Sequence, residues 1–167
     1  MVSVTFSLDP GGAAKIVYRD LEEHFAGRTP TLAETRSAVL KIRAAKSMVI
    51  DPDDPNSRSA GSFFKNPIVE RSMLTRIADA ALVDAVPHFD AGDEMVKVPA
   101  AWLIEQAGFR KGFAMGNAGI STNHSLALIN RGGATAREIV ELKDRIVGTV
   151  EERFNITLIP EPVFIGF

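Results

Sequence analysis

The sequence predicts an α+β protein, with helices and short strands interleaved along the chain. Apolar residues make up 46% of the 167 positions, which is enough for a packed core, and charged residues at 24% are typical of a chain that folds in water. Three segments have apolar residues at helical spacing, and the apolar runs between them are strand-length. The strands do not recur at the spacing of parallel βαβ units, so α+β is favoured over a doubly wound sheet.

Composition excludes several functional classes. The net charge of −2 and a pI near 5.9 give no sign of a nucleic-acid or acidic-membrane partner. No apolar run approaches the roughly 18 residues of a membrane span, and the first residues lack the basic region of a signal peptide. We therefore expect a cytoplasmic protein. The chain has no cysteine, and His24, His88 and His124 are far apart, so we expect no metal site.

The first elements are a strand and a helix. Val2–Leu8 alternates apolar and polar residues, which predicts a half-buried strand that needs a sheet to join. Asp9–Gly12 is a turn signal. Thr31 and Glu34 form a capping box that opens a helix ending near Lys46. The strand has no obvious partner downstream, which indicates that the chain is a piece of something larger.

The segment Asp51–Ser57 is rich in Asp, Pro, Asn and Ser. A calcium loop would need a glycine at mid-loop and a glutamate at the twelfth position, where Ser62 stands, so we interpret the segment as a linker. It predicts a domain boundary between residues 1–58 and residues 59–167.

The stretch Ser59–Pro67 has a composition suited to binding. If its centre is extended, Ser62, Phe64 and Asn66 lie on one face, with Lys65 on the other. A hydroxyl and an amide on one face beside a lysine suit a polar anionic ligand. The same residues also fit a capped edge strand with a solvated lysine, and the pattern alone leaves both interpretations open.

The remaining segments predict one compact domain. Their apolar spacing and flanking turn or capping residues indicate helices and strands in alternation. We expect helices over 69–86, 99–108 and 135–155, and strands over 94–98, 126–129 and 156–159. Thr135 and Glu138 supply a second capping box, and Trp102 is expected in the core.

Three ordered motifs resemble one family. They are Ser-Ala-Gly-Ser-Phe-Phe-Lys-Asn-Pro at 59–67, Ala-Gly-Ile-Ser-Thr-Asn-His-Ser-Leu-Ala-Leu-Ile-Asn at 118–130, and Leu-Ile-Pro-Glu-Pro-Val-Phe-Ile-Gly at 158–166. Their order and spacing are similar to those of the UDP-N-acetylenolpyruvoylglucosamine reductases. The resemblance implies a substrate-binding domain of the MurB type after a short remnant of an FAD-binding domain, in total about the C-terminal half of an enzyme.

The resemblance implies a flavoenzyme of peptidoglycan precursor synthesis. NADPH would reduce FAD, and the flavin would reduce UDP-N-acetylglucosamine enolpyruvate to UDP-N-acetylmuramate. Ser62 matches the family's proton donor, and Glu161 matches its second catalytic residue near the C-terminus. Gly61 would let the flavin ring and the substrate come close. Pro162 replaces a residue that is not proline in many members.

The resemblance also implies residues that bind the substrate. Lys46 and Lys65 would neutralise the diphosphate, Asn66 would hydrogen-bond the sugar or nucleotide, and His124 lies within the second motif. Lys46 is equally interpretable as a favourable cation at a helix C-terminus, and a lone histidine is often only structural.

A different functional class stays open beside the enzyme. The flavin-binding region that family members carry upstream, with its diphosphate loop and a catalytic arginine, cannot be assigned in these residues. The alternative is a stand-alone UDP-sugar binding module without redox activity, and the isolated chain is expected to be inactive in either case. The sequence does not determine the oligomeric state.

Overall fold

The computed structural model describes residues 2–166. Met1, the first residue of the expected N-terminal domain, and Phe167, the last residue of the expected C-terminal domain, lie outside the described residues. The chain divides into two compact units, and the division falls between Val49 and Ile50 in the sequence. The linker Asp51–Ser57 therefore belongs with the C-terminal unit, where Pro55–Ser57 forms a short 3-10 helix, η1.

The N-terminal unit contains two helices, α1 (Arg19–Phe25) and α2 (Leu32–Ala45). Its small core consists of Leu21, Phe25 and Ala38. The predicted capping box is confirmed: the Thr31 hydroxyl accepts a hydrogen bond from the Glu34 N–H at 3.2 Å, and the Glu34 carboxylate accepts from the Thr31 N–H at 2.8 Å.

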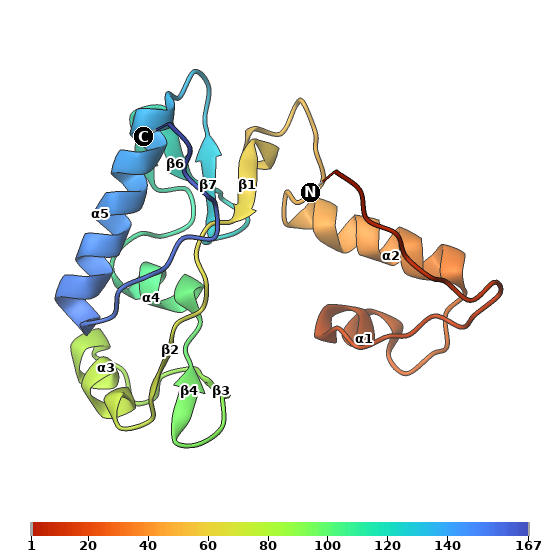
Figure 1. Cartoon of the computed structure of the whole chain (residues 1–167), viewed down its shortest axis with the longest axis horizontal. Helices are drawn as coiled ribbons and strands as arrows, with labels where there is room; N and C mark the ends of the chain where they lie inside the picture. Colours follow the sequence, from red (N-terminus) through yellow and green to blue (C-terminus); the bar gives the residue numbers. More distant parts are fainter. Residues whose placement is uncertain (1, 167) are drawn as a thin grey trace. The chain divides into compact units, whose positions relative to one another are not determined.

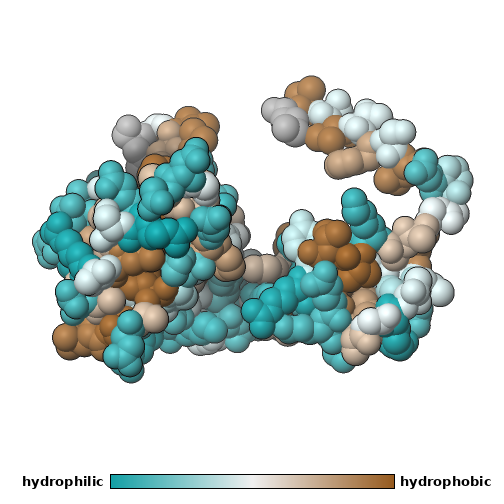
Figure 2. All heavy atoms as spheres, turned by 90° about the horizontal axis from the view of Figure 1, so that it is seen from below, coloured by the Kyte–Doolittle hydropathy of each residue, from teal (hydrophilic) through white to brown (hydrophobic). Residues whose placement is uncertain are grey.

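The predicted strand at Val2–Leu8 is wrong. The segment has no regular secondary structure, and its apolar side chains are exposed, with Phe6 at 78% and Leu8 at 82%. Figure 2 shows an extended run of exposed apolar and small polar residues there. Alternation predicts a strand only where a neighbouring strand supplies hydrogen bonds, and every strand among residues 2–166 lies in the C-terminal unit.

The C-terminal unit contains two antiparallel sheets, which confirms the α+β class (Figure 1). The four-stranded sheet has the order β1-β7-β6-β5, with β1 Ser59–Ser62, β5 Ala114–Met115, β6 Ala118–Ile120 and β7 Ala127–Asn130. The three-stranded sheet has the order β2-β4-β3, with β2 Ile68–Glu70, β3 Phe89–Asp90 and β4 Met95–Lys97.

Three helices pack with these sheets around one core. They are α3 (Met73–Ala81), α4 (Ala100–Gln106) and α5 (Ala136–Phe154). The helix expected over 69–86 is shorter because its first residues pair with β4 as strand β2. Trp102 is half-buried and packs against the core, with its ring 6.4 Å from that of Phe154. No helix among residues 2–166 is long and apolar enough to cross a bilayer.

The strand expected over 156–159 is wrong. These residues form no regular strand, and a single bridge joins Pro160 to Phe64. The two prolines around Glu161 remove backbone donors, so a continuous ladder cannot form. The alternation expected after Ser62 is wrong as well, because Phe63 and Phe64 are both buried, at 4% and 1% exposure.

The N-terminus of α5 is fixed by Glu138, as the second capping box predicts. Its carboxylate accepts hydrogen bonds from the Thr135 N–H at 2.8 Å and from the Asn117 N–H at 3.1 Å, in the turn between β5 and β6. Both hydrogen bonds lower the pKa of Glu138, and the bond from Thr135 has the larger effect. One carboxylate therefore ties the longest helix to the β5–β6 hairpin.

We expect Glu138→Gln to destabilise the protein in a pH-dependent way. The pKa of Glu138 is lower in the folded protein than in the unfolded chain. The contribution of its charge to the free energy of unfolding is therefore complete above the unfolded pKa of about 4.3, and it is lost as the pH falls through the folded pKa. Thermal melts should therefore place the variant below the parent near neutral pH and bring the two curves together in strong acid. Glu141→Gln, an exposed substitution on the same helix, is the control. An offset that persists in strong acid would contradict the charge-based explanation.

Candidate active site around Ser62

Ser62 lies at the end of β1, where this strand leaves the four-stranded sheet. β1 is antiparallel to β7, with Ser62 opposite Ala127, and the Phe63 N–H donates to the Leu126 carbonyl at 2.9 Å. The half-buried Ser62 hydroxyl lies 3.2 Å from Nε2 of His124. The first two motifs, 62 residues apart in sequence, therefore meet through one side-chain hydrogen bond.

The loop that carries His124 is anchored at both ends. The Thr122 N–H donates to Oδ1 of Asn56 at 2.9 Å, and Ser121 is fully buried. On the other side of His124, the hydroxyl of the buried Ser125 donates to the Glu105 carboxylate from α4. Restraints on both flanks reduce the conformations open to His124 and so help to hold its ring beside the Ser62 hydroxyl.

The third motif reaches the same place through the backbone. The Glu161 N–H donates to the Phe63 carbonyl at 2.9 Å, and the Lys65 N–H donates to the Ile159 carbonyl at 2.9 Å. Glu161 is thus hydrogen-bonded to the residue after Ser62. Its side chain is exposed, and the rings of the flanking prolines restrict its backbone.

Gly61 presents an open surface next to Ser62. Its φ of +82° lies in the region that favours glycine, and a Cβ added there would meet no atom within 4 Å. A flat ring can therefore approach the backbone at this point. The space beside Gly61 leaves room for a flat ring such as a flavin.

Asn66 has a structural contact that the sequence did not predict. Its Oδ1 accepts a hydrogen bond from the Ala100 N–H at 2.9 Å, which satisfies one of the free donors at the start of α4. Pro99, which precedes this helix, cannot provide a side-chain cap. Lys65, one residue earlier, is exposed.

Lys46 belongs to the other compact unit. It follows the last residue of α2 and forms an ion pair with Asp20 of α1. Both side chains are about half exposed, so the pair contributes little to stability.

Within residues 2–166, no group of three or more carboxylates and histidines has an arrangement that would hold a metal ion.

Sequence reasoning missed the residues that anchor the histidine loop. Asn56 lies in the linker and Glu105 on α4, and neither lies within the three motifs. The two serines that flank His124 were within the second motif, but their burial depends on contacts with distant segments. The only available signal was the unusual density of small polar residues in an otherwise apolar stretch.

Comparisons with known proteins agree with the three motifs. Residues 53–165 match the family described as UDP-N-acetylenolpyruvoylglucosamine reductase, C-terminal domain. A protein of that reductase name from Thermobifida fusca (strain YX) is 49% identical over 140 residues, which cover 81% of this chain and 39% of that protein.

Two further relatives carry the same reductase name. One from Mycobacterium tuberculosis (strain ATCC 25177 / H37Ra) is 43% identical and covers 99% of this chain and 47% of its own length. One from Streptomyces coelicolor (strain ATCC BAA-471 / A3(2) / M145) is 46% identical, and the match covers 84% of this chain and 38% of that protein. The chain thus spans less than half the length of these relatives.

Proposed function

This chain belongs to the UDP-N-acetylenolpyruvoylglucosamine reductase family, and from this membership we propose that it forms the substrate-binding and proton-donating part of such an enzyme. The observation that carries the proposal is the convergence of the three motifs, through the contact of Ser62 with His124 and the hydrogen bond from Glu161 to Phe63. The reaction would reduce the enolpyruvyl double bond of a UDP-sugar to a lactyl ether.

Ser62 would donate the proton that completes this reduction. A bound flavin, reduced by NADPH, would supply the hydride that is added to the outer carbon of the double bond. Charge then develops on the adjacent carbon and on the substrate carboxylate, and the Ser62 hydroxyl transfers its proton to that carbon. A hydroxyl is a weak acid, so it must be held within hydrogen-bond reach of its acceptor. The contact with His124 at 3.2 Å supports this role because it fixes the position of the serine oxygen.

Glu161 would be the second catalytic residue, beside Phe63. A general acid works only when it is fixed near the proton acceptor. The backbone hydrogen bond to Phe63 and the two adjacent prolines support such a fixed position. In this proposal, Glu161 helps to polarise or protonate the intermediate.

The remaining predicted residues would bind the UDP-sugar. Lys65 is exposed and available for the diphosphate. Asn66 uses its oxygen at the start of α4, so its amide nitrogen is the group that would donate to the ligand. Lys46 would contribute from the N-terminal unit. In this proposal, residues 1–58 are the end of an FAD-binding domain, residues 59–167 bind the substrate, and Gly61 faces the flavin.

A chimera tests the proposal. We expect this chain, joined to the upstream half of the Thermobifida fusca relative, to purify with flavin and to oxidise NADPH when the enolpyruvyl UDP-sugar is added. The isolated chain should bind the UDP-sugar in calorimetry but should retain no flavin after gel filtration. A chimera that folds and binds both flavin and the UDP-sugar but does not turn over would support the stand-alone binding module instead. Absence of UDP-sugar binding by both proteins would contradict the proposal.

A further inference from the structure

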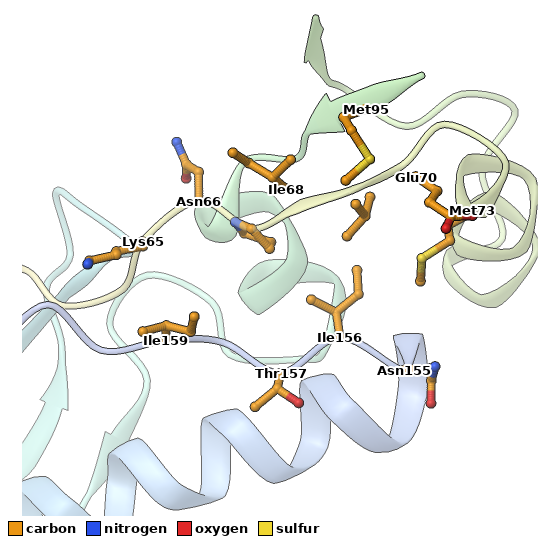
Figure 3. Close-up of a pocket in the computed structure, with 12 residues that line it drawn as sticks. Lys65, Asn66, Ile68, Glu70, Met73, Met95, Asn155, Ile156, Thr157 and Ile159 are labelled. Carbon is orange, nitrogen blue, oxygen red and sulfur yellow. The ribbon is translucent and has the colours of Figure 1, made fainter. Parts of the chain in front are cut away.

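The segment that follows α5 turns back and runs along that helix. Figure 3 shows its first part, residues 155–159, beside α5 and opposite the segment that carries Lys65. The two segments meet where the Lys65 N–H donates to the Ile159 carbonyl at 2.9 Å, at one end of a groove of about 650 Å³. We call residues 159–166, which continue from this contact through Glu161, the C-terminal strap.

The C-terminal strap contacts the buried Phe63 at two points. The Glu161 N–H donates to the Phe63 carbonyl at 2.9 Å. Three residues later, the ring of Phe164 lies 6.3 Å from the ring of Phe63, with the two planes at 58°. Because Phe63 directly follows Ser62, the backbone of Glu161 and the ring of Phe164 are both in contact with the neighbour of the proposed proton donor.

A lysine of α5 also contacts the Phe164 ring. The ammonium of Lys143 lies 5.3 Å from the ring centroid, within the distance of a cation–π interaction. The Lys143 side chain is only 17% exposed, which is low for a lysine, and it pairs with the exposed carboxylate of Asp144. A cation–π interaction strengthens when the cation is shielded from water, so Lys143 is suited to hold this ring.

Glu161 lies between the hydrogen bond to Phe63 and the Phe164 ring. Its N–H is bonded, and Pro162 restricts its backbone to extended conformations. Residues 161–166 form no helix or strand, so no ladder of hydrogen bonds fixes the direction in which the chain leaves Glu161. The contacts of Phe164 supply that direction, and they restrict the positions that the exposed Glu161 carboxylate can sample.

We propose that Phe164 is a positioning residue for Glu161, and that Phe63 and Lys143 hold its ring in place. This inference rests on the proposed function, in which Glu161 acts on the intermediate beside Ser62. A shift of about 1 Å in the position of a catalytic group can slow a reaction about 10²-fold. Loss of the Phe164 ring should therefore slow the chemical step and leave substrate binding nearly unchanged.

Packing alone is the competing explanation for the Phe164 ring. A phenyl ring next to Phe63 also shields apolar surface, and its removal would then lower stability without a specific effect on Glu161. The two explanations predict different results in a variant that already lacks the Glu161 carboxylate, because a positioning residue has nothing left to position there.

Amide hydrogen exchange of the chain, measured by NMR, tests the anchor without catalysis. We expect Phe164→Ala to raise the exchange rate of the Glu161 N–H by about tenfold or more, because local opening of the C-terminal strap becomes easier. The Phe63 N–H, which donates to the Leu126 carbonyl, should exchange as in the parent. Ile165→Ala is the matched control, since Ile165 is 85% exposed in the same strap, and it should change neither rate.

Variants of Lys143 test the contribution of the cation. Lys143→Met keeps an apolar stem but removes the charge, and it should raise the exchange rate of the Glu161 N–H about threefold, as expected for loss of one cation–π interaction. Lys143→Arg keeps a cation over the ring and should stay close to the parent. Asp144→Asn removes the ion pair but leaves the cation, and it should also stay close to the parent.

The chimera tests the positioning role through kcat. Phe164→Ala should lower kcat about tenfold with little change in KM, and Phe164→Trp, which keeps an aromatic face for Lys143, should restore most of the loss. In a Glu161→Gln background, Phe164→Ala should lower kcat further by only about twofold or less. Ile165→Ala should leave kcat unchanged.

The outcomes separate this inference from the proposed function. Equal losses of kcat from Phe164→Ala with and without the Glu161 carboxylate would overturn the positioning role and leave the proposed function intact. Unchanged exchange of the Glu161 N–H in Phe164→Ala, or a loss of substrate affinity as large as the loss of kcat, would overturn it as well. A parent chimera that binds flavin and the UDP-sugar but does not turn over would overturn the proposed function together with this inference.

Discussion

Phe64→Ala is expected to destabilise the C-terminal unit by about 3–5 kcal/mol, the usual cost of removing a buried phenyl ring. Phe64 is 1% exposed, its ring lies 5.4 Å from that of Phe63, and its backbone forms the bridge to Pro160. The truncation would leave a cavity beneath the segment that joins the first and third motifs. Circular dichroism melts and denaturant titrations should show a large drop in midpoint.

Phe89→Ala provides a matched control for this substitution. Phe89 is 62% exposed on β3, so the same truncation should change the free energy of unfolding by less than about 1 kcal/mol. Equal effects of the two variants would contradict the assignment of Phe64 to the core. Because Phe64 lies between Ser62 and Lys65, a folded Phe64 variant should also bind the UDP-sugar more weakly.

In the chimera, Ser62→Ala is expected to lower kcat by about 10²–10⁴-fold, the range for loss of a general acid. Loss of the hydroxyl removes both the proposed proton and the hydrogen bond to His124. Substrate affinity should change little, because the proton is transferred only in the chemical step. Flavin reduction by NADPH should proceed normally, and only the substrate-dependent reoxidation should slow, which stopped-flow absorbance can resolve.

Ser59→Ala is the control for removal of a hydroxyl from the same strand. The Ser59 oxygen accepts a hydrogen bond from the Gly61 N–H at 3.2 Å and is not the group that contacts His124. We expect its kcat to remain close to that of the parent. If Ser62→Ala reduced binding and turnover by similar factors, Ser62 would be a binding residue, and the proton would have to come from another group.

Local signals in the sequence predicted well the two helices that the capping boxes open, α2 and α5. Both capping boxes form as expected, because each depends only on residues three positions apart and on the helix that they open. The long C-terminal helix was expected over 135–155 and spans Ala136–Phe154, because its apolar stripe is regular over five turns. Patterns contained within one element were therefore sufficient for these two helices.

Features that depend on distant residues were not predictable. Val2–Leu8 has the pattern of a strand but finds no sheet among residues 2–166. Phe63 and Phe64 are both buried because the Phe63 N–H and C=O bond to different segments, at Leu126 and Glu161, which turns the backbone there. Nothing in the sequence indicated where those segments would lie.

The residues of the candidate site were predictable individually, but most of their contacts were not. The contact of Ser62 with His124 joins two motifs that the resemblance had identified separately. The cap that Asn66 provides for α4 joins residues 34 positions apart, and no spacing rule predicts it. The sequence thus proposed candidate side chains, whereas their contacts depend on how distant segments fold together.

The placement of the single tryptophan determines what an optical experiment on this chain can detect. Trp102 packs against Phe154 in the core of the C-terminal unit, and the N-terminal unit has only tyrosine and phenylalanine as aromatic chromophores. Tryptophan emission will therefore follow the unfolding of residues 50–166 alone. A sharp fluorescence transition would leave the folding of α1 and α2 unmeasured, so a probe placed in residues 2–49 is needed for the whole chain.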